Sequence, residues 1–242
     1  MPYSVLTTSG MRTRPRRRLR RLVIDFSSVL ILAGLLLLLD AGVTLLWQEP
    51  VTAAIGLVAR SDVNKRYLSY QTAPLSVIDR DALAGLRSRR ERIAYLARRE
   101  QRQLRTGDAV GRIELPRIGA GYTIVEGTDE QSLEKGPGHY PATALPGMGL
   151  TVAVAGHRTT YLAPFKQINE LVAGDRILIT MPYGRFTYRV QYQKIVVPTA
   201  LWVTRNVGYD RLVLSACNPL YSAAQRIIVF ARLQSVQPLG PA

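Results

Sequence analysis

The residue types with the clearest chemical potential surround the single cysteine, Cys217. This cysteine ends an apolar run at residues 212–216, and Arg226 precedes a second apolar run at residues 227–233. Both runs are rich in β-branched residues and predict buried strands. If these strands pair antiparallel, Cys217 and Arg226 face each other about 5 Å apart. A thiol beside a permanent cation is more nucleophilic, and a fixed guanidinium group can stabilise an oxyanion.

The chain has two histidines, and both are candidates for the base that a cysteine nucleophile needs. His157 follows the apolar run 152–155, where a buried strand should end. His139 lies in a turn-rich loop with the sequence Gly-Pro-Gly-His-Tyr-Pro. A catalytic base must sit on a rigid element. We therefore favour His157 as the catalytic histidine and expect His139 to pack or to shape the site.

Other site chemistries lack their sequence signatures. One cysteine and two histidines, without Cys-x-x-Cys or His-x-x-x-His spacing, do not make a tetrahedral metal site. Scattered carboxylates such as Glu170 and Asp175 are usually solvated, so we predict no metal and no cofactor. The sequence contains no phosphate-binding loop, dinucleotide fingerprint or serine nucleophile elbow.

The residues from Gly111 onward must form the scaffold that positions these groups. Short apolar segments separated by turns predict strands at 112–118, 122–126, 150–155, 176–181, 185–192 with 194–197, 212–216 and 227–233. Two short helical pieces are expected at 129–134 and 164–171. Strands of this length and spacing indicate a closed or nearly closed β-barrel of about eight strands.

The N-terminal part predicts a membrane anchor. Residues 26–47 are almost entirely apolar, and as a helix they would extend for about 33 Å, enough to cross a bilayer. Seven arginines and no acidic residue lie in 1–22, which should be an unstructured tail. The positive-inside rule places this tail in the cytoplasm and the C-terminal part outside. A cleaved signal peptide is the less favoured alternative, because the apolar run is too long and no small-x-small site follows it.

The formal net charge of +15 is concentrated outside the predicted barrel. Residues 60–105 carry twelve bases and five acids, whereas residues 106–242 carry thirteen bases and nine acids. This distribution argues against a nucleic-acid groove and favours contact with anionic lipid or wall polymer. Within the basic stretch, residues 79–105 predict a solvated, charge-laced helix that holds the C-terminal domain away from the membrane.

Three motifs resemble those of the sortase family. They are Ala-Gly-His-Arg-Thr-Thr-Tyr at 155–161, Leu-Ser-Ala-Cys-Asn-Pro at 214–219 and Gln-Arg-Ile-Ile-Val at 225–229. Residues 136–147 and 163–165 add support, and the resemblance covers about 111–233. It is greatest to class E sortases of the actinobacterial type. The resemblance implies an all-β fold, an eight-stranded sortase-type β-barrel with short helices, preceded by one transmembrane helix and a basic helical spacer.

The resemblance also implies roles for individual residues. Cys217 matches the family's nucleophile, His157 its general acid and base, and Arg226 the arginine that stabilises the substrate and the oxyanion. One departure is that Ala216 stands where the family commonly has threonine, so a hydroxyl beside the nucleophile is lost. The residues expected to bind substrate are Ala216, Asn218, His139 and Arg158. The loop 199–210, before the cysteine strand, is expected to line the substrate groove.

Sortases cleave a C-terminal sorting motif, Leu-Pro-x-Thr-Gly-like or in class E often Leu-Ala-x-Thr-Gly-like, between threonine and glycine. The acyl group passes to the thiol and then to an amine on a peptidoglycan precursor or a pilin. The expected partners are therefore surface proteins with such a motif, that amine acceptor, and membrane lipid around the N-terminal helix. No nucleic acid is expected. The implied location is the cell membrane, single-pass, with the catalytic domain extracellular.

The sequence thus predicts four segments: a cytoplasmic Arg-rich tail at 1–22, a transmembrane anchor at 23–47, a basic, partly helical extracytoplasmic spacer at 48–106 and a catalytic domain at 107–242. Two alternatives remain open. An L,D-transpeptidase usually has glycine before the cysteine and arginine soon after it, whereas Ala216 and Asn218 flank Cys217 here. A non-catalytic, membrane-tethered domain could instead bind anionic wall polymer through 60–105.

Overall fold

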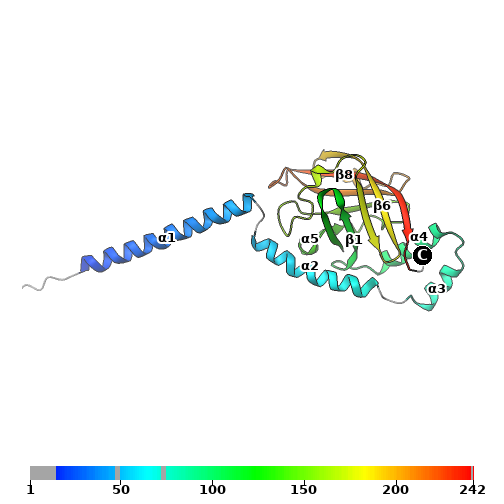
Figure 1. The fold of residues 1–242 in the computed structure, drawn as a ribbon, viewed down its shortest axis with the longest axis horizontal. Coiled ribbons are helices and arrows are strands. Elements are labelled where there is room, and N and C mark those ends of the chain that lie inside the picture. Colours follow the sequence, from blue (N-terminus) through cyan, green and yellow to red (C-terminus); the bar gives the residue numbers. More distant parts are fainter. Residues whose placement is uncertain (1–14, 47–49, 72–74, 241) are drawn as a thin grey trace, which may run out of the picture. The chain divides into compact units, whose positions relative to one another are not determined.

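The computed structural model describes residues 15–46, 50–71, 75–240 and 242 (Figure 1). The chain divides into two compact units, Met1–Trp47 and Gln48–Ala242. The boundary at residue 107 that the sequence suggests for a separate catalytic domain stays a prediction, because residues on both sides of it belong to the second unit.

The first unit contains the long helix α1 (Pro15–Leu46). Its segment Ile24–Val43 has a mean hydropathy of 2.2 and none of it is buried, so by length and composition it could cross a membrane. The Ser28 hydroxyl donates to the carbonyl oxygen of Ile24 at 2.9 Å, which satisfies a polar group within the apolar helix. Because α1 begins at Pro15, the expectation of an unstructured tail is wrong for residues 15–22; residues 1–14 lie outside the described residues.

The second unit begins with α2 (Pro50–Gln71), α3 (Val77–Ala84) and α4 (Arg89–Gln103). A reciprocal capping box starts α4: the Ser88 hydroxyl accepts from the Glu91 N–H at 3.1 Å, and the Glu91 carboxylate accepts from the Ser88 N–H at 2.9 Å. The apolar face of α4, made by Ile93, Leu96 and Ala97, is buried in the main core.

The prediction of a solvated helix over 79–105 is therefore wrong in two respects. The helix is interrupted, since α3 ends at Gly85 and α4 starts only after Ser88. One face is also packed, because apolar residues three and four positions apart form a stripe that the barrel covers. The buried Asp79 carboxylate joins the two helices through Arg99 Nε at 2.7 Å and the Tyr95 hydroxyl at 2.9 Å. Because this segment contains many charged residues, the narrow apolar stripe is difficult to recognise in its sequence.

Eight strands form a closed barrel in the order β1-β2-β3-β4-β7-β8-β6-β5 (Figure 1). This confirms the predicted architecture. The strands are β1 (Ala109–Leu115), β2 (Ala120–Glu126), β3 (Gly138–His139), β4 (Thr151–Ala155), β5 (Arg176–Met181), β6 (Gly184–Val196), β7 (Arg211–Asn218) and β8 (Gln225–Pro238). The sequence pattern does not predict β3, because two residues carry no periodicity, and it predicts a break in β6, which is continuous through a register shift.

Short helices connect the strands. The first predicted strand ends early, since Pro116 starts the 3₁₀ turn η1 (Pro116–Ile118). The helix expected at 129–134 is confirmed as α5 (Glu130–Lys135), which Asp129 caps by accepting from the Ser132 N–H at 3.0 Å. Only the 3₁₀ turn η2 (Ile168–Glu170) forms in the helical piece expected at 164–171. A further 3₁₀ turn, η3 (Leu201–Thr204), lies between β6 and β7.

Side chains alternate between two sides of the sheet on the strands next to Cys217. Leu212, Leu214 and Ala216 of β7 point into the main core inside the barrel. The intervening side chains belong to a smaller group on the outside, the outer cluster, which consists of Ala153, Val203, Val213, Ile228 and Phe230. The outer cluster thus joins β4, β7, β8 and η3, and its side of the sheet is the one that Cys217 shares.

Candidate active site

Three neighbouring strands bring the predicted catalytic residues to one rim of the barrel. β7 pairs antiparallel with β8, and Cys217 lies opposite Arg226, as the sequence predicts. β4 pairs in parallel with β7, with Ala155 opposite Ser215. The Gly156 N–H extends this pairing by donating to the carbonyl oxygen of Ser215 at 3.0 Å. His157 and Cys217 each follow the last pair of these two strands by two residues, so both lie at the same rim.

Two of the three side chains share one side of the sheet. The alternation that places every second residue of β7 and β8 in the outer cluster continues to the ends of these strands. It therefore puts Cys217 and Arg226 on the outer face. Cys217 itself is half-buried.

His157 has a ring nitrogen that the fold does not use. Its Nε2 is buried and has no hydrogen-bond partner among the described residues. Burial lowers the pKa of His157, while the carboxylates of Glu134 and Glu130 oppose that shift. The imidazole is therefore neutral near pH 7, and its Nε2 keeps the capacity to accept a proton.

The loop that follows His157 is held in an unusual conformation. Residues 161–163 all have left-handed backbone angles, with φ of 49°, 66° and 42°. Such angles are uncommon outside glycine and cluster at functional sites. The Phe165 N–H closes the loop on the carbonyl oxygen of His157 at 2.9 Å. Gly156 is required beside it, since a Cβ there would lie 2.5 Å from a Phe165 ring carbon.

Arg158 connects this loop to the end of β7. The Nη1 group donates to the carbonyl oxygen of Cys217 at 3.2 Å and to Oδ1 of Asn218 at 3.1 Å. The Nη2 group donates to Oδ1 of Asn169 at 2.8 Å. The residue is buried, which lowers the pKa of Arg158, and the attraction of Cys217 opposes this shift. The guanidinium group thus holds the backbone of the cysteine; substrate binding by Arg158 stays a prediction.

The other predicted contact residues lie at the same rim. Ala216 is 3% exposed and packs in the main core, so its side chain points away from the thiol. A hydroxyl there would point into the barrel. Asn218 donates from Nδ2 to Oε1 of Gln225 at 3.1 Å. Arg226 Nη1 donates to the carbonyl oxygens of Ala223 and Gln225 at 3.0 and 2.9 Å. The assignments of Ala216 and Asn218 to substrate binding stay predictions.

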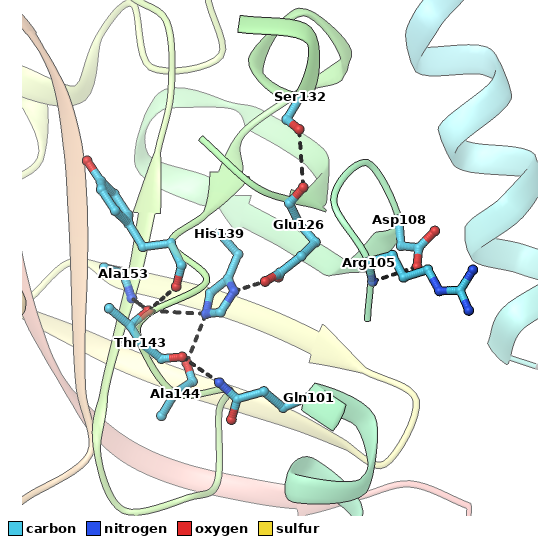
Figure 2. A network of polar contacts seen from close by, with 10 residues as sticks. Gln101, Arg105, Asp108, Glu126, Ser132, His139, Thr143, Ala144 and Ala153 are labelled. Carbon is cyan, nitrogen blue, oxygen red and sulfur yellow. Dashed lines mark hydrogen bonds and ion pairs between the residues drawn. The ribbon is translucent and has the colours of Figure 1, made fainter. Parts of the chain in front are cut away.

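His139 occupies a closed polar network one strand away (Figure 2). Its Nδ1 lies 2.7 Å from the Glu126 carboxylate, and its Nε2 lies 3.0 Å from the carbonyl oxygen of Ala144 and 3.2 Å from the Thr143 hydroxyl. Gln101 of α4 donates to the Thr143 carbonyl oxygen at 2.7 Å. With 1% exposure and both nitrogens engaged, His139 holds the 140–144 loop in shape rather than presenting a base.

No group of three metal-ligating side chains occurs in the part of the chain that the structure describes.

Known proteins match the part of the chain that contains these residues. The sequence model of the sortase domain matches residues 113–234. Sortase D of Bacillus subtilis is 36% identical over 132 residues, 52% of this chain and 65% of that protein. Sortase SrtE1 of Streptomyces coelicolor is 27% identical over 148 residues, 54% of this chain and 42% of that protein. The chain therefore spans less than two thirds of the length of either curated relative.

A solved structure agrees with these sequence relatives. The structure of sortase E from Streptomyces avermitilis matches with a TM-score of 0.51 and 35% identity, over 55% of this chain and 93% of that one.

Proposed function

The chain belongs to the sortase family, and from this premise we propose that it is a membrane-anchored cysteine transpeptidase. Its substrates are surface proteins with an LPxTG-like or LAxTG-like C-terminal sorting motif, cut between threonine and glycine. The observation that supports the proposal is the pairing of the half-buried Cys217 with Arg226 at one rim, where the neighbouring strand ends two residues before His157.

The first half-reaction forms a thioester. His157 Nε2 takes the proton of the Cys217 thiol, and the sulfur attacks the threonine carbonyl carbon of the motif. The electron pair of the carbonyl moves to its oxygen, and Arg226 stabilises the resulting negative charge. When the tetrahedral intermediate collapses, the C–N bond breaks, and the leaving glycine amine takes the proton from His157.

The second half-reaction releases the acyl group to an amine. The acceptor nitrogen attacks the thioester carbonyl, and His157 takes the proton that the nitrogen loses. The C–S bond then breaks, and the leaving sulfur takes this proton from His157, which restores the Cys217 thiol and the neutral imidazole. An amine on a peptidoglycan precursor or on a pilin is the acceptor class.

Arg158 supports both steps as a positioning residue. It touches the carbonyl oxygen of Cys217 from the loop that also carries His157, so one side chain sets the separation of nucleophile and base. The loop 199–210 forms one wall of the substrate groove. This proposal rests on Val203 of η3, which packs in the outer cluster beside β7 and β8.

The proposed membrane anchor is α1, whose segment Ile24–Val43 is long and apolar enough to cross a bilayer. The arginines at and before its start keep the N-terminus in the cytoplasm, and the catalytic unit is extracellular.

The test is intact-protein mass spectrometry of the full chain in neutral detergent, incubated with LAxTG and LPxTG peptides. We expect an adduct with the mass of the peptide's N-terminal fragment in the wild type and none in Cys217→Ala. An added amine should discharge it. Absence of an adduct with both peptides, from folded protein, would contradict the transpeptidase proposal. The relative yields rank the two motifs.

A further inference from the structure

A concave site lies at the other end of the cysteine strand. A cavity of about 490 Å³ opens between the first turn of α4, the 208–210 segment and the later half of β8. Asp210 directly precedes β7, and Cys217 is seven residues further along the chain, which corresponds to roughly 23 Å of strand. The cavity is therefore separate from the rim that carries the proposed catalysis.

Three arginines from distant parts of the sequence line this cavity. Arg89 and Arg90 come from α4, and Arg232 comes from β8. Among the described residues, none of the three has a carboxylate within salt-bridge distance. The guanidinium carbon of Arg232 lies 4.7 Å from the ring centroid of Tyr209, which stacks the side chain against the wall. We call this group the arginine pocket.

Asp210 is the one acidic side chain among the described lining residues, and it bonds to the backbone of a neighbouring loop. Its carboxylate accepts from the Gly149 N–H at 2.9 Å. Burial raises the pKa of Asp210, and the Gly149 N–H and Arg90 oppose this shift. Arg90 reaches towards the same loop, since its Nη2 lies 3.7 Å from where a Cβ on Gly149 would be. Three cations against one bonded carboxylate leave the pocket with two unmatched positive charges.

The rest of the lining is apolar, from Ile93 of α4 and from Leu233 and Val236 of β8. A guanidinium group binds phosphate oxygens in pairs. The lining thus suits a fixed anion that carries an aliphatic attachment. The basic stretch 60–105, whose charge the transpeptidase reaction does not use, supplies two of the three arginines.

We propose that the arginine pocket binds a glycerol phosphodiester, either as the headgroup of an anionic phospholipid or as a soluble ester. The site is independent of the proposed transpeptidase reaction. Bound phosphodiester lies between Arg90 and Arg232, with its attachment on the apolar wall.

The test uses the full chain in neutral detergent and three probes: short-chain phosphatidylglycerol, phosphatidylcholine with the same chains, and glycerophosphoglycerol. Native mass spectrometry and calorimetry measure stoichiometry and affinity. We expect one phosphatidylglycerol per chain, and weaker binding of phosphatidylcholine because its choline cation meets the arginines. The double variant Arg90→Gln/Arg232→Gln should lose affinity at least about tenfold.

Arg98→Gln is the matched control, because Arg98 is an exposed arginine of the same helix outside the cavity. It should leave binding within twofold of wild type. Equal affinity for glycerophosphoglycerol identifies a soluble ester, whereas binding of the lipid alone identifies a headgroup. Equal losses in the double variant and Arg98→Gln, or no saturable binding at low ionic strength, would overturn the proposal. Peptide acyl transfer should be unchanged in all variants, which keeps this test separate from that of the enzyme.

Discussion

The two histidines of the chain lie on or directly after neighbouring strands and meet opposite surroundings. His139 on β3 is 1% exposed, with an acceptor at each ring nitrogen. His157, two residues beyond β4, is half-buried, and its Nε2 has no partner among the described residues. An imidazole that has a hydrogen-bond partner at both ring nitrogens stabilises the fold. It does not serve as a base, because proton transfer would break its network.

The fold uses the polar atoms of these two regions differently. The network around His139 gives both ring nitrogens a partner, and it extends from Glu126 to Thr143 (Figure 2). The rim that carries Cys217 leaves His157 Nε2 without a partner among the described residues, and the backbone at 161–163 is left-handed. Both features cost stability, and both are expected where a reaction supplies the missing partner.

The substitution His157→Gln is expected to have the largest effect on activity. We expect the rate of acyl transfer to fall about a thousandfold or more, because a general acid and base is lost. The melting temperature should stay near that of wild type, since no hydrogen bond of His157 Nε2 is removed. Thioester formation followed by mass spectrometry, beside thermal unfolding, measures both. Retention of activity within tenfold would remove His157 from the mechanism.

His139→Ala should have the reverse profile. It leaves the Glu126 carboxylate, whose side chain is 9% exposed, without its hydrogen-bond partner at His139 Nδ1. We expect the free energy of unfolding to fall by about 3 kcal/mol. Activity per folded molecule should change less than threefold. Denaturant unfolding and active-site titration of the thiol measure the two quantities; lost activity with intact stability would instead assign His139 to the catalytic site.

Glu100 is a third polar group to compare with the two histidines, and the proposed reaction does not use its carboxylate. Burial is the main reason that the pKa of Glu100 rises from 4.5 to about 7, and its Oε1 has no partner among the described residues. Between these pH values the folded chain binds a proton that the unfolded chain has lost. Stability should therefore fall as pH rises through this window, by up to about 3 kcal/mol.

Glu100→Gln should remove that slope. Unfolding free energies of wild type and variant, measured from pH 4.5 to pH 8, should diverge as pH rises, with the variant more stable at the alkaline end. Parallel curves would show that Glu100 titrates at its ordinary pKa in the folded state.

The smallest expected effect concerns Arg158. Arg158→Lys keeps a cation but cannot reach Cys217, Asn218 and Asn169 together. We expect kcat to fall about tenfold while KM for the sorting peptide changes less than twofold, because the variant misplaces the nucleophile and leaves the groove intact. Arg98→Lys is the control. A rise in KM alone would assign Arg158 to substrate binding, the role predicted from sequence.

Much of the candidate site can be predicted from the sequence. The pairing of Cys217 with Arg226 depends on two strands joined by a short turn, so the spacing of two apolar runs predicts it. The position of His157 after a predicted strand indicates a catalytic base. Its location at the same rim as Cys217, however, depends on the parallel pairing of β4 with β7. That pairing joins residues about sixty positions apart, which local periodicity cannot register.

The long apolar helix, the barrel and the cysteine–arginine pair can be predicted from the sequence, because each follows from hydrophobic periodicity within one or two neighbouring segments. Which polar groups are satisfied depends on the tertiary structure. His139 and His157 are the same residue type near similar strand ends, and distant partners separate them: Glu126 engages one ring, whereas the free Nε2 of the other meets no partner among the described residues. The packing of α4 was decided in the same way, since burial depends on the surface that a helix meets as well as on its own stripe.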